Sequence, residues 1–217
     1  MFPISDINPS KSRPIVTYSI VAINIAVFVY EIVLSARGDV LEFIVEFALT
    51  PVHVVQGAAL YTLVTSMFLH SGFMHVFSNM LYLYIFGDNV EDIMGRKRFI
   101  LFYLLCGLAA SAAQLAVHPL SNVPNLGASG AVAGVLGAYL IMFPRARVHC
   151  ILIFGFFIRW ITLPAVVVLG FWFVIQFFSG VASLPYVTQD AGGVAYFAHM
   201  GGFVAGMVLI KMFARPA

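Results

Sequence analysis

Four side chains that could carry out acyl chemistry stand in segments that are otherwise apolar. Ser129 and His199 lie far apart in the chain, and His75 and Asn79 precede both. A serine hydroxyl is a weak nucleophile until a base accepts its proton, which either histidine could do. An oxyanion could bind to the carboxamide of Asn79, to the second imidazole and to free N–H groups at a helix N-terminus. These residue types indicate a serine nucleophile with a histidine base.

The composition indicates which elements must position these side chains. Of 217 residues, 62% are hydrophobic and only 9% are charged, whereas soluble domains carry roughly 25% charged residues. The chain is therefore expected to be an integral membrane protein. Because the apolar runs lack the alternation of a β-barrel, we expect an all-α fold in one compact membrane domain over residues 1–217. Six spans are predicted, over residues 15–34, 73–90, 99–117, 129–143, 161–178 and 194–213.

The positive charges predict how these helices are oriented. If the N-terminus is cytoplasmic, Arg37 alone of the 11 Lys and Arg residues faces outward. The positive-inside rule therefore places both termini in the cytoplasm. The second, fourth and sixth spans then run from outside to inside, so that their outer ends share one depth. His75 and Asn79, four residues apart, lie on one helix face near that depth.

Small residues predict which helices touch. Gly130, Gly134 and Gly137 lie in the fourth span, and Gly127 lies just before it, so that the four follow one another at steps of three or four residues. Gly202 and Gly206 form a small-x-x-x-small pair in the sixth. Without side chains at these positions two helices can approach closely, which would bring Ser129 to His199.

Other kinds of site fit the sequence less well. No His-Glu-x-x-His motif occurs, so an intramembrane zinc site of the usual form is not expected. Asp88 and Asp190 fall at opposite membrane faces, which argues against an aspartic protease. No basic cluster of the size needed for nucleic acid is present. We therefore expect no metal, no cofactor and no nucleic-acid partner.

Three segments together resemble the rhomboid family of intramembrane serine proteases, from about Tyr61 to the end of the sixth span. The first, residues 70–80, is similar to the family's helix-two motif with its histidine and asparagine. Gly127-Ala-Ser129-Gly130 is similar to the Gly-x-Ser-Gly nucleophile motif. Ala198-His199-Met-Gly-Gly202 is similar to the helix-six motif.

The resemblance implies roles for the residues. Ser129 would be the nucleophile and His199 the general base, while His75, Asn79 and the backbone N–H of Ser129 would bind the oxyanion. Substrates would be transmembrane helices of other membrane proteins, cut near their outer ends, and the location a prokaryotic cell membrane. A cap over residues 180–193 and the fifth helix would admit the substrate. A non-catalytic rhomboid-like protein that binds membrane helices for quality control is the alternative.

The sequence departs from the family pattern at two places. Many members have Trp-Arg where this chain has Tyr61-Thr62, so the anchoring of the first outer loop is expected to differ. Some members stack the catalytic histidine on an aromatic ring one turn after the serine, where this chain has Ala133. Tyr139, ten residues after Ser129, faces elsewhere on the helix. The sequence does not indicate which residue orients His199.

Overall fold

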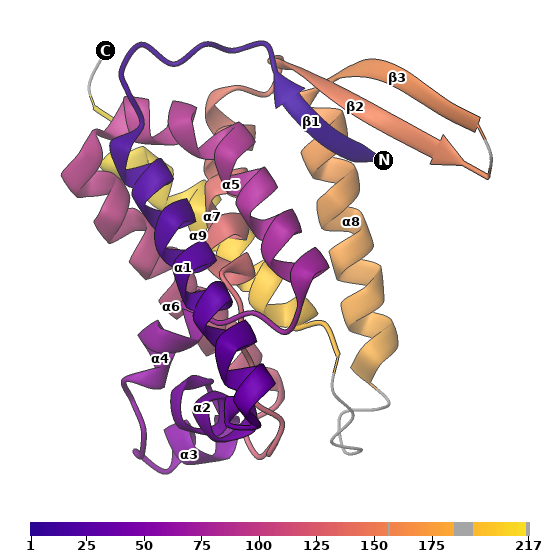
Figure 1. Ribbon diagram of the computed structural model, residues 1–217. Helices are drawn as coiled ribbons and strands as arrows, with labels where there is room; N and C mark the ends of the chain where they lie inside the picture. The colour runs from indigo at the N-terminus through magenta and orange to yellow at the C-terminus, as the bar shows by residue number, and fades with distance from the viewer. Residues whose placement is uncertain (156, 185–192, 216–217) are drawn as a thin grey trace.

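The computed structural model describes residues 1–155, 157–184 and 193–215, and six long helices account for most of them (Figure 1). These are α1 (Ile15–Arg37), α5 (Phe73–Met94), α6 (Arg96–Val117), α7 (Ser129–Met142), α8 (Ala165–Ser183) and α9 (Tyr196–Phe213). Four of them, α1, α6, α8 and α9, are long and apolar enough to cross a membrane. The predicted runs thus form helices, and the chain is an integral membrane protein.

Helix α7 occupies the centre of the bundle. All of its residues from Gly130 to Tyr139 are buried, as expected for a helix that is apolar around its whole circumference. It contacts α9 backbone to backbone, because an added Cβ at Gly202 would overlap the carbonyl oxygen of Gly130, and one at Gly206 would overlap that of Gly134. The fourth and sixth predicted spans therefore touch along their glycines.

Helix α1 is held at its first turn by a carboxylate from α5. Glu91, which is 2% exposed, accepts the backbone N–H groups of Val16 at 3.1 Å and Thr17 at 2.8 Å, and the Thr17 hydroxyl at 2.8 Å. The first N–H groups of a helix have no partner within the helix, and its N-terminal dipole favours a negative charge. The Glu91 carboxylate accepts two of these N–H groups, brings a negative charge to the N-terminus of α1, and joins α1 to α5.

A three-stranded antiparallel sheet corrects the all-helical expectation. Its order is β1 (Phe2–Asp6), β2 (Arg147–Phe154), β3 (Phe157–Pro164), and Figure 1 shows it across one end of the bundle. Residues 161–164, expected to open the fifth span, belong to β3, because this stretch is rich in the β-branched and aromatic residues that favour strands. Pro164 then caps α8, which begins at Ala165. The Tyr139 hydroxyl donates to Asp6 of β1, so Tyr139 does face away from Ser129.

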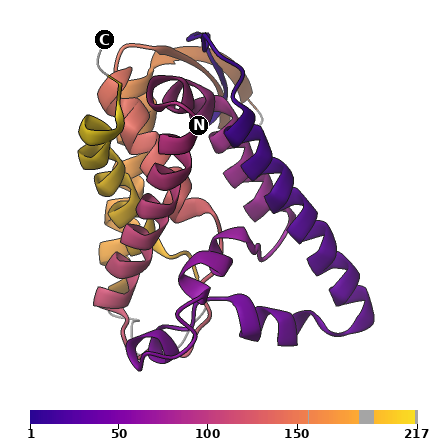
Figure 2. The ribbon, with the colours of Figure 1, turned by 90° about the vertical axis from the view of Figure 1, so that its left-hand side faces the viewer.

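The connection from α1 to α5 forms the opposite end of the molecule (Figures 1 and 2). It contains α2 (Val40–Phe47), α3 (Pro51–Val55), α4 (Thr62–Thr65) and the 3-10 turn η1 (Ser66–Phe68). The Tyr61 hydroxyl donates toward the side chain and the backbone carbonyl of Glu46, and the Thr65 hydroxyl donates to the carbonyl of Phe47 at 2.7 Å. These contacts anchor the loop through Tyr61 and Thr65.

Candidate active site

Ser129 and His199 meet at the end of the bundle away from the sheet. Ser129 is the first residue of α7 and His199 lies in the first turn of α9. The distance from Ser129 Oγ to His199 Nε2 is 2.8 Å, which is within reach for proton transfer between a nucleophile and its base. The glycine contact between α7 and α9 begins one residue after Ser129, so the two side chains are held by a rigid pair of helices.

The backbone before α7 is shaped by Gly127. Its φ of +129° lies in a region that residues with a Cβ rarely adopt, and its N–H donates to the carbonyl of Ser66 at 2.8 Å. An added Cβ would lie 2.7 Å from His75 Nε2 and 3.6 Å from Ser129 Oγ. Because Gly127 has no side chain, a space is left there that is bordered by His75 Nε2 and Ser129 Oγ.

His75 presents a hydrogen-bond donor to this space. The backbone N–H of Ser71 donates to His75 Nδ1 at 3.4 Å, and the Ser71 hydroxyl lies 3.0 Å from the same atom. A neutral imidazole that accepts at Nδ1 carries its proton on Nε2. The Nε2–H group therefore lies beside Gly127 and Ser129 as a donor.

Asn79 lies one turn after His75 on the same face of α5. The side chain is buried, and its Nδ2 has no hydrogen-bond partner among the described residues. Buried donors nearly always have a partner, so the unpaired N–H groups of Asn79 Nδ2 are available to a bound group. The structure therefore brings His75 and Asn79 to the same end of the bundle as Ser129 and His199.

Two residues of α8 at this site were not found by sequence reasoning. Gln176 Oε1 lies 2.7 Å from His199 Nδ1, and the Trp172 ring lies against the His199 ring with centroids 5.8 Å apart and planes at 34°. The aromatic ring beside His199 therefore comes from α8, whereas Ala133, one turn after Ser129, is buried within the core. A lone glutamine in an apolar span was the available signal, because polar groups at membrane depth are costly and are usually functional.

A small cavity of about 50 Å³ with both polar and apolar lining residues borders Ser129. Its lining includes Ser66, Ser111, Gln114, Asn125 and Ser129. The Gln114 Oε1 atom is buried and has no partner among the described residues. A polar space of this size is large enough for a water molecule, whose share of liquid volume is about 30 Å³.

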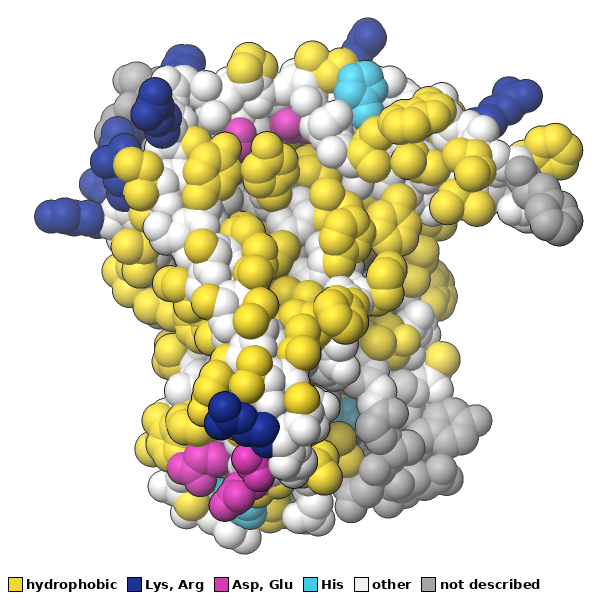
Figure 3. Space-filling view, viewed as in Figure 1, with side chains coloured by type: hydrophobic (Ala, Val, Ile, Leu, Met, Phe, Trp, Pro, Cys, Tyr) yellow, Lys and Arg dark blue, Asp and Glu magenta, His cyan; other side chains and the backbone are white. Residues whose placement is uncertain are grey.

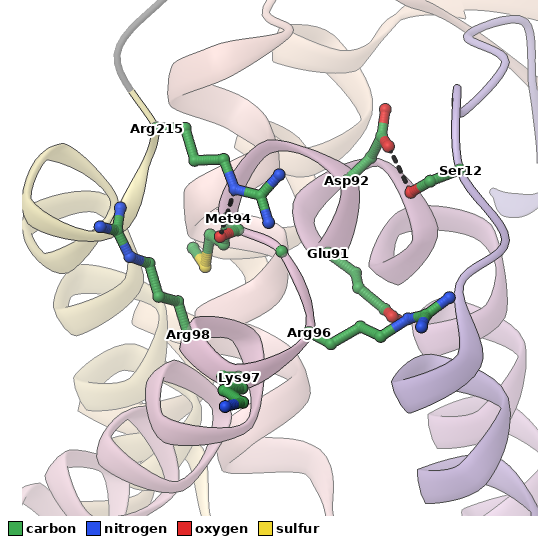
Figure 4. Close-up of a pocket in the computed structure, with 9 residues that line it drawn as sticks. Ser12, Glu91, Asp92, Met94, Arg96, Lys97, Arg98 and Arg215 are labelled. Carbon is green, nitrogen blue, oxygen red and sulfur yellow. Dashed lines mark hydrogen bonds between the residues drawn. The ribbon is translucent and has the colours of Figure 1, made fainter.

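A larger cavity of about 870 Å³ lies at the other end of the bundle, where α5 ends and α6 begins (Figure 4). Its polar lining includes Ser12, Asp92, Arg96, Lys97, Arg98 and Arg215. The Ser12 hydroxyl donates to Asp92 at 2.5 Å, and Arg215 Nε donates to the carbonyl of Met94 at 3.2 Å. The lining contains no histidine beside a hydroxyl. The pairing of a hydroxyl with an imidazole therefore occurs at the smaller cavity, which Ser129 borders.

The expected cap over residues 180–193 includes residues 185–192, which lie outside the described residues.

Comparison of the sequence with known proteins identifies the family of this chain. Residues 57–216 match the model of the Rhomboid domain. Rhomboid protein 1, mitochondrial, of Saccharomyces cerevisiae is 33% identical over 158 residues, which cover 68% of this chain and 40% of that protein. RHOMBOID-like protein 6, mitochondrial, of Arabidopsis thaliana is 34% identical over 156 residues, which cover 72% of this chain and 44% of that protein.

A bacterial relative extends the comparison. Rhomboid protease GluP of Bacillus subtilis is 32% identical over 130 residues, which cover 60% of this chain and 25% of that protein. The match thus spans less than half the length of each of these three relatives. Because the family model covers most of the residues and includes the segments that carry Ser129, His199, His75 and Asn79, this chain belongs to the rhomboid family.

Proposed function

We propose that this protein is an intramembrane serine endopeptidase that cleaves transmembrane helices of other proteins near the outer leaflet. The observation that carries the proposal is the 2.8 Å distance between Ser129 Oγ and His199 Nε2 at the N-terminus of a buried helix. Membership of a family that contains named proteases supports the reaction class.

The proposed reaction is acyl transfer to Ser129. His199 Nε2 accepts the hydroxyl proton as Oγ attacks the scissile carbonyl, and the resulting oxyanion is bound by His75 Nε2–H, Asn79 Nδ2–H and the backbone N–H of Ser129. His199 then donates the proton to the leaving amine, which leaves an acyl-enzyme. Water, for which the cavity beside Ser129 has room, then gives a proton to His199 and attacks the acyl carbonyl. His199 returns that proton to Ser129 Oγ as the ester bond breaks, which releases the acid and restores the site. His199 thus takes up and returns each proton that the reaction moves.

We also propose six membrane crossings with both termini in the cytoplasm. Because β1 precedes α1 and pairs with β2, which follows α7, the chain between them must cross the membrane an even number of times. Crossings by α1, α5, α6 and α7 satisfy this requirement, and α8 and α9 return the chain to the same side. Figure 3 shows most Lys and Arg side chains at the end that carries the sheet, which supports a cytoplasmic position for that end.

This topology sets the proposed depth of the site. Helix α7 has 14 residues and is thus about 21 Å long, compared with about 30 Å for the hydrocarbon core. Ser129 at its outer end would therefore lie roughly 10 Å below the outer surface, which favours cleavage near the outer leaflet. A preference for small residues before the scissile bond is part of the proposal by analogy with the family. A prokaryotic cell membrane stays a prediction, since the relatives include mitochondrial proteins.

The proposal is tested by active-site labelling and by cleavage of a model transmembrane helix in proteoliposomes. A fluorophosphonate probe should label wild-type protein and should fail to label Ser129→Ala or His199→Ala, with loss of cleavage in both. Ser19→Ala is the matched control, because its hydroxyl donates to the carbonyl of Ile15 on α1. Binding of the helix without any cleavage or labelling of the wild type would favour the non-catalytic alternative.

A further inference from the structure

The sequence left open what orients His199, and the contact with Gln176 bears on this question. Gln176 is 9% exposed in the interior of α8, a helix whose other residues are almost all apolar. Its Oε1 lies 2.7 Å from His199 Nδ1, on the side of the imidazole opposite Ser129. The glutamine, the imidazole and the serine hydroxyl therefore form one continuous chain of hydrogen bonds from α8 through α9 to α7.

The protonation of the imidazole decides whether this chain supports catalysis. A neutral imidazole has one N–H and one lone pair. His199 can accept the proton of Ser129 only if the lone pair is on Nε2, and hence only if Nδ1 carries the hydrogen. An acceptor at 2.7 Å from Nδ1, such as Gln176 Oε1, stabilises this tautomer. The opposite amide orientation would donate to Nδ1 and place the hydrogen on Nε2, where it blocks proton transfer.

The membrane environment explains why an amide is suited to this place. Serine proteases in water use a buried aspartate to hold the histidine in its reactive tautomer. A charged carboxylate inside an apolar helix costs several kcal/mol, whereas an amide oxygen accepts the same hydrogen bond without a net charge. The part of α8 that the structure describes contains no acidic residue, so Gln176 is its only side-chain carbonyl beside the imidazole.

Trp172 restricts the imidazole in a second direction. It lies one turn before Gln176 on α8, and its ring packs against both His199 and Phe203 of α9. The tryptophan therefore limits tilting of the imidazole plane, while the amide limits rotation within that plane. Both contacts come from a single helix face, since residues four apart lie one above the other.

On these grounds we infer that Gln176 is a positioning residue that makes a triad of Ser129, His199 and Gln176, with the amide oxygen holding His199 in its Nδ1–H tautomer. The inference rests on the proposed function. It predicts a defect in turnover without a defect in substrate binding, because Gln176 acts through His199.

The first test compares two substitutions of Gln176 in the full chain. Gln176→Met keeps the length and shape of the side chain but has no strong acceptor. It should lower kcat by about 10- to 100-fold, which is less than the roughly 10²–10⁴-fold that a general base contributes, because His199 itself is still present. KM and thermal stability in detergent should stay near the wild-type values. Gln176→Glu keeps an acceptor oxygen and should recover part of the lost kcat. Ile175→Leu, a neighbouring exposed position on α8, is the control and should behave as wild type.

The second test measures the tautomer directly and does not depend on activity. Nitrogen-15 NMR of His199 in detergent micelles, in the Ser129→Ala background, should show a protonated Nδ1, and Gln176→Met should populate the Nε2–H form. The inference is overturned by wild-type kcat in Gln176→Met, or by a proton on His199 Nε2 when Gln176 is intact. It is also overturned if Gln176→Glu is as thermally stable as the wild type but no more active than Gln176→Met. Retention of labelling and cleavage in Ser129→Ala itself would instead refute the proposed function, and the tautomer measurement would still stand.

Discussion

The contact between α7 and α9 predicts that Gly206→Ala, a change of one methyl group, impairs catalysis from a distance. The added Cβ would lie 2.6 Å from the carbonyl carbon and 2.7 Å from the Cα of Gly134. Ordinary contacts between carbon atoms are about 3.5–4.0 Å, so the two backbones must separate by about 1 Å. Gly206 lies seven residues after His199, which is close to two helical turns, and therefore on nearly the same face.

The expected effect follows from this separation. Added to the 2.8 Å between Ser129 Oγ and His199 Nε2, a shift of about 1 Å exceeds the reach of about 3.2 Å for proton transfer. A misplacement of that size can lower the rate on the order of 100-fold, and overpacking of this kind costs about 1–3 kcal/mol of stability. The larger Gly206→Leu should be worse in both respects, although it too touches no reacting atom.

The assay is the rate of fluorophosphonate labelling, with thermal unfolding in detergent measured on the same samples. Gly170→Ala on α8 is the matched control, because nothing lies within 4 Å of a Cβ added there, and alanine favours a helix over glycine by about 1 kcal/mol. It should label at the wild-type rate. If Gly206→Ala also labels and unfolds as the wild type does, the close contact between the two helices is wrong.

Three further outcomes are expected. Asn79→Ala should lower turnover on the order of 10- to 1,000-fold with measurable residual cleavage, since one oxyanion donor is lost; cleavage at the wild-type rate would leave Asn79 a packing role only. Glu91→Leu should destabilise the protein by about 2–4 kcal/mol, because two buried N–H groups of α1 lose their acceptor; urea unfolding of the purified protein measures this, and an unchanged midpoint would contradict the helix-terminus contact. EDTA should leave cleavage of the model helix unaffected, and strong inhibition that added zinc reverses would point to a metal that the proposed mechanism does not use.

The helices and the approach of Ser129 to His199 were predictable from sequence because each depends on a local pattern. Apolar runs mark the helices, and the glycines at Gly130 and Gly206 mark the faces that meet. The family resemblance, confirmed by the comparison with known proteins, depends on three such local motifs. The positions of Ser129 and His199 in the structure agree with that reading, and their catalytic roles stay a proposal.

The sheet and Gln176 were not predictable for different physical reasons. Strands β1 (residues 2–6) and β2 (residues 147–154) pair although they are far apart in the sequence. Neither segment alone indicates which other segment it pairs with. Apolar strands near a membrane also resemble the start of a helix in composition, which is why residues 161–164 were assigned to a span. For Gln176 the sequence shows a polar group in an apolar helix, but the rotation of α8 against α9 decides whether that group meets His199.

The pairing of β1 with β2 also has a consequence for biosynthesis. Residues 2–6 leave the ribosome before the helices, yet their partner strand is made only after α1, α5, α6 and α7. The pairing of β1 with β2 closes a loop of more than a hundred residues, and contacts between such distant segments form slowly during folding. A ribosome-bound chain stopped before residue 147 should therefore keep residues 2–6 open to a protease added on the ribosome's side of the membrane, and the completed, released chain should protect them.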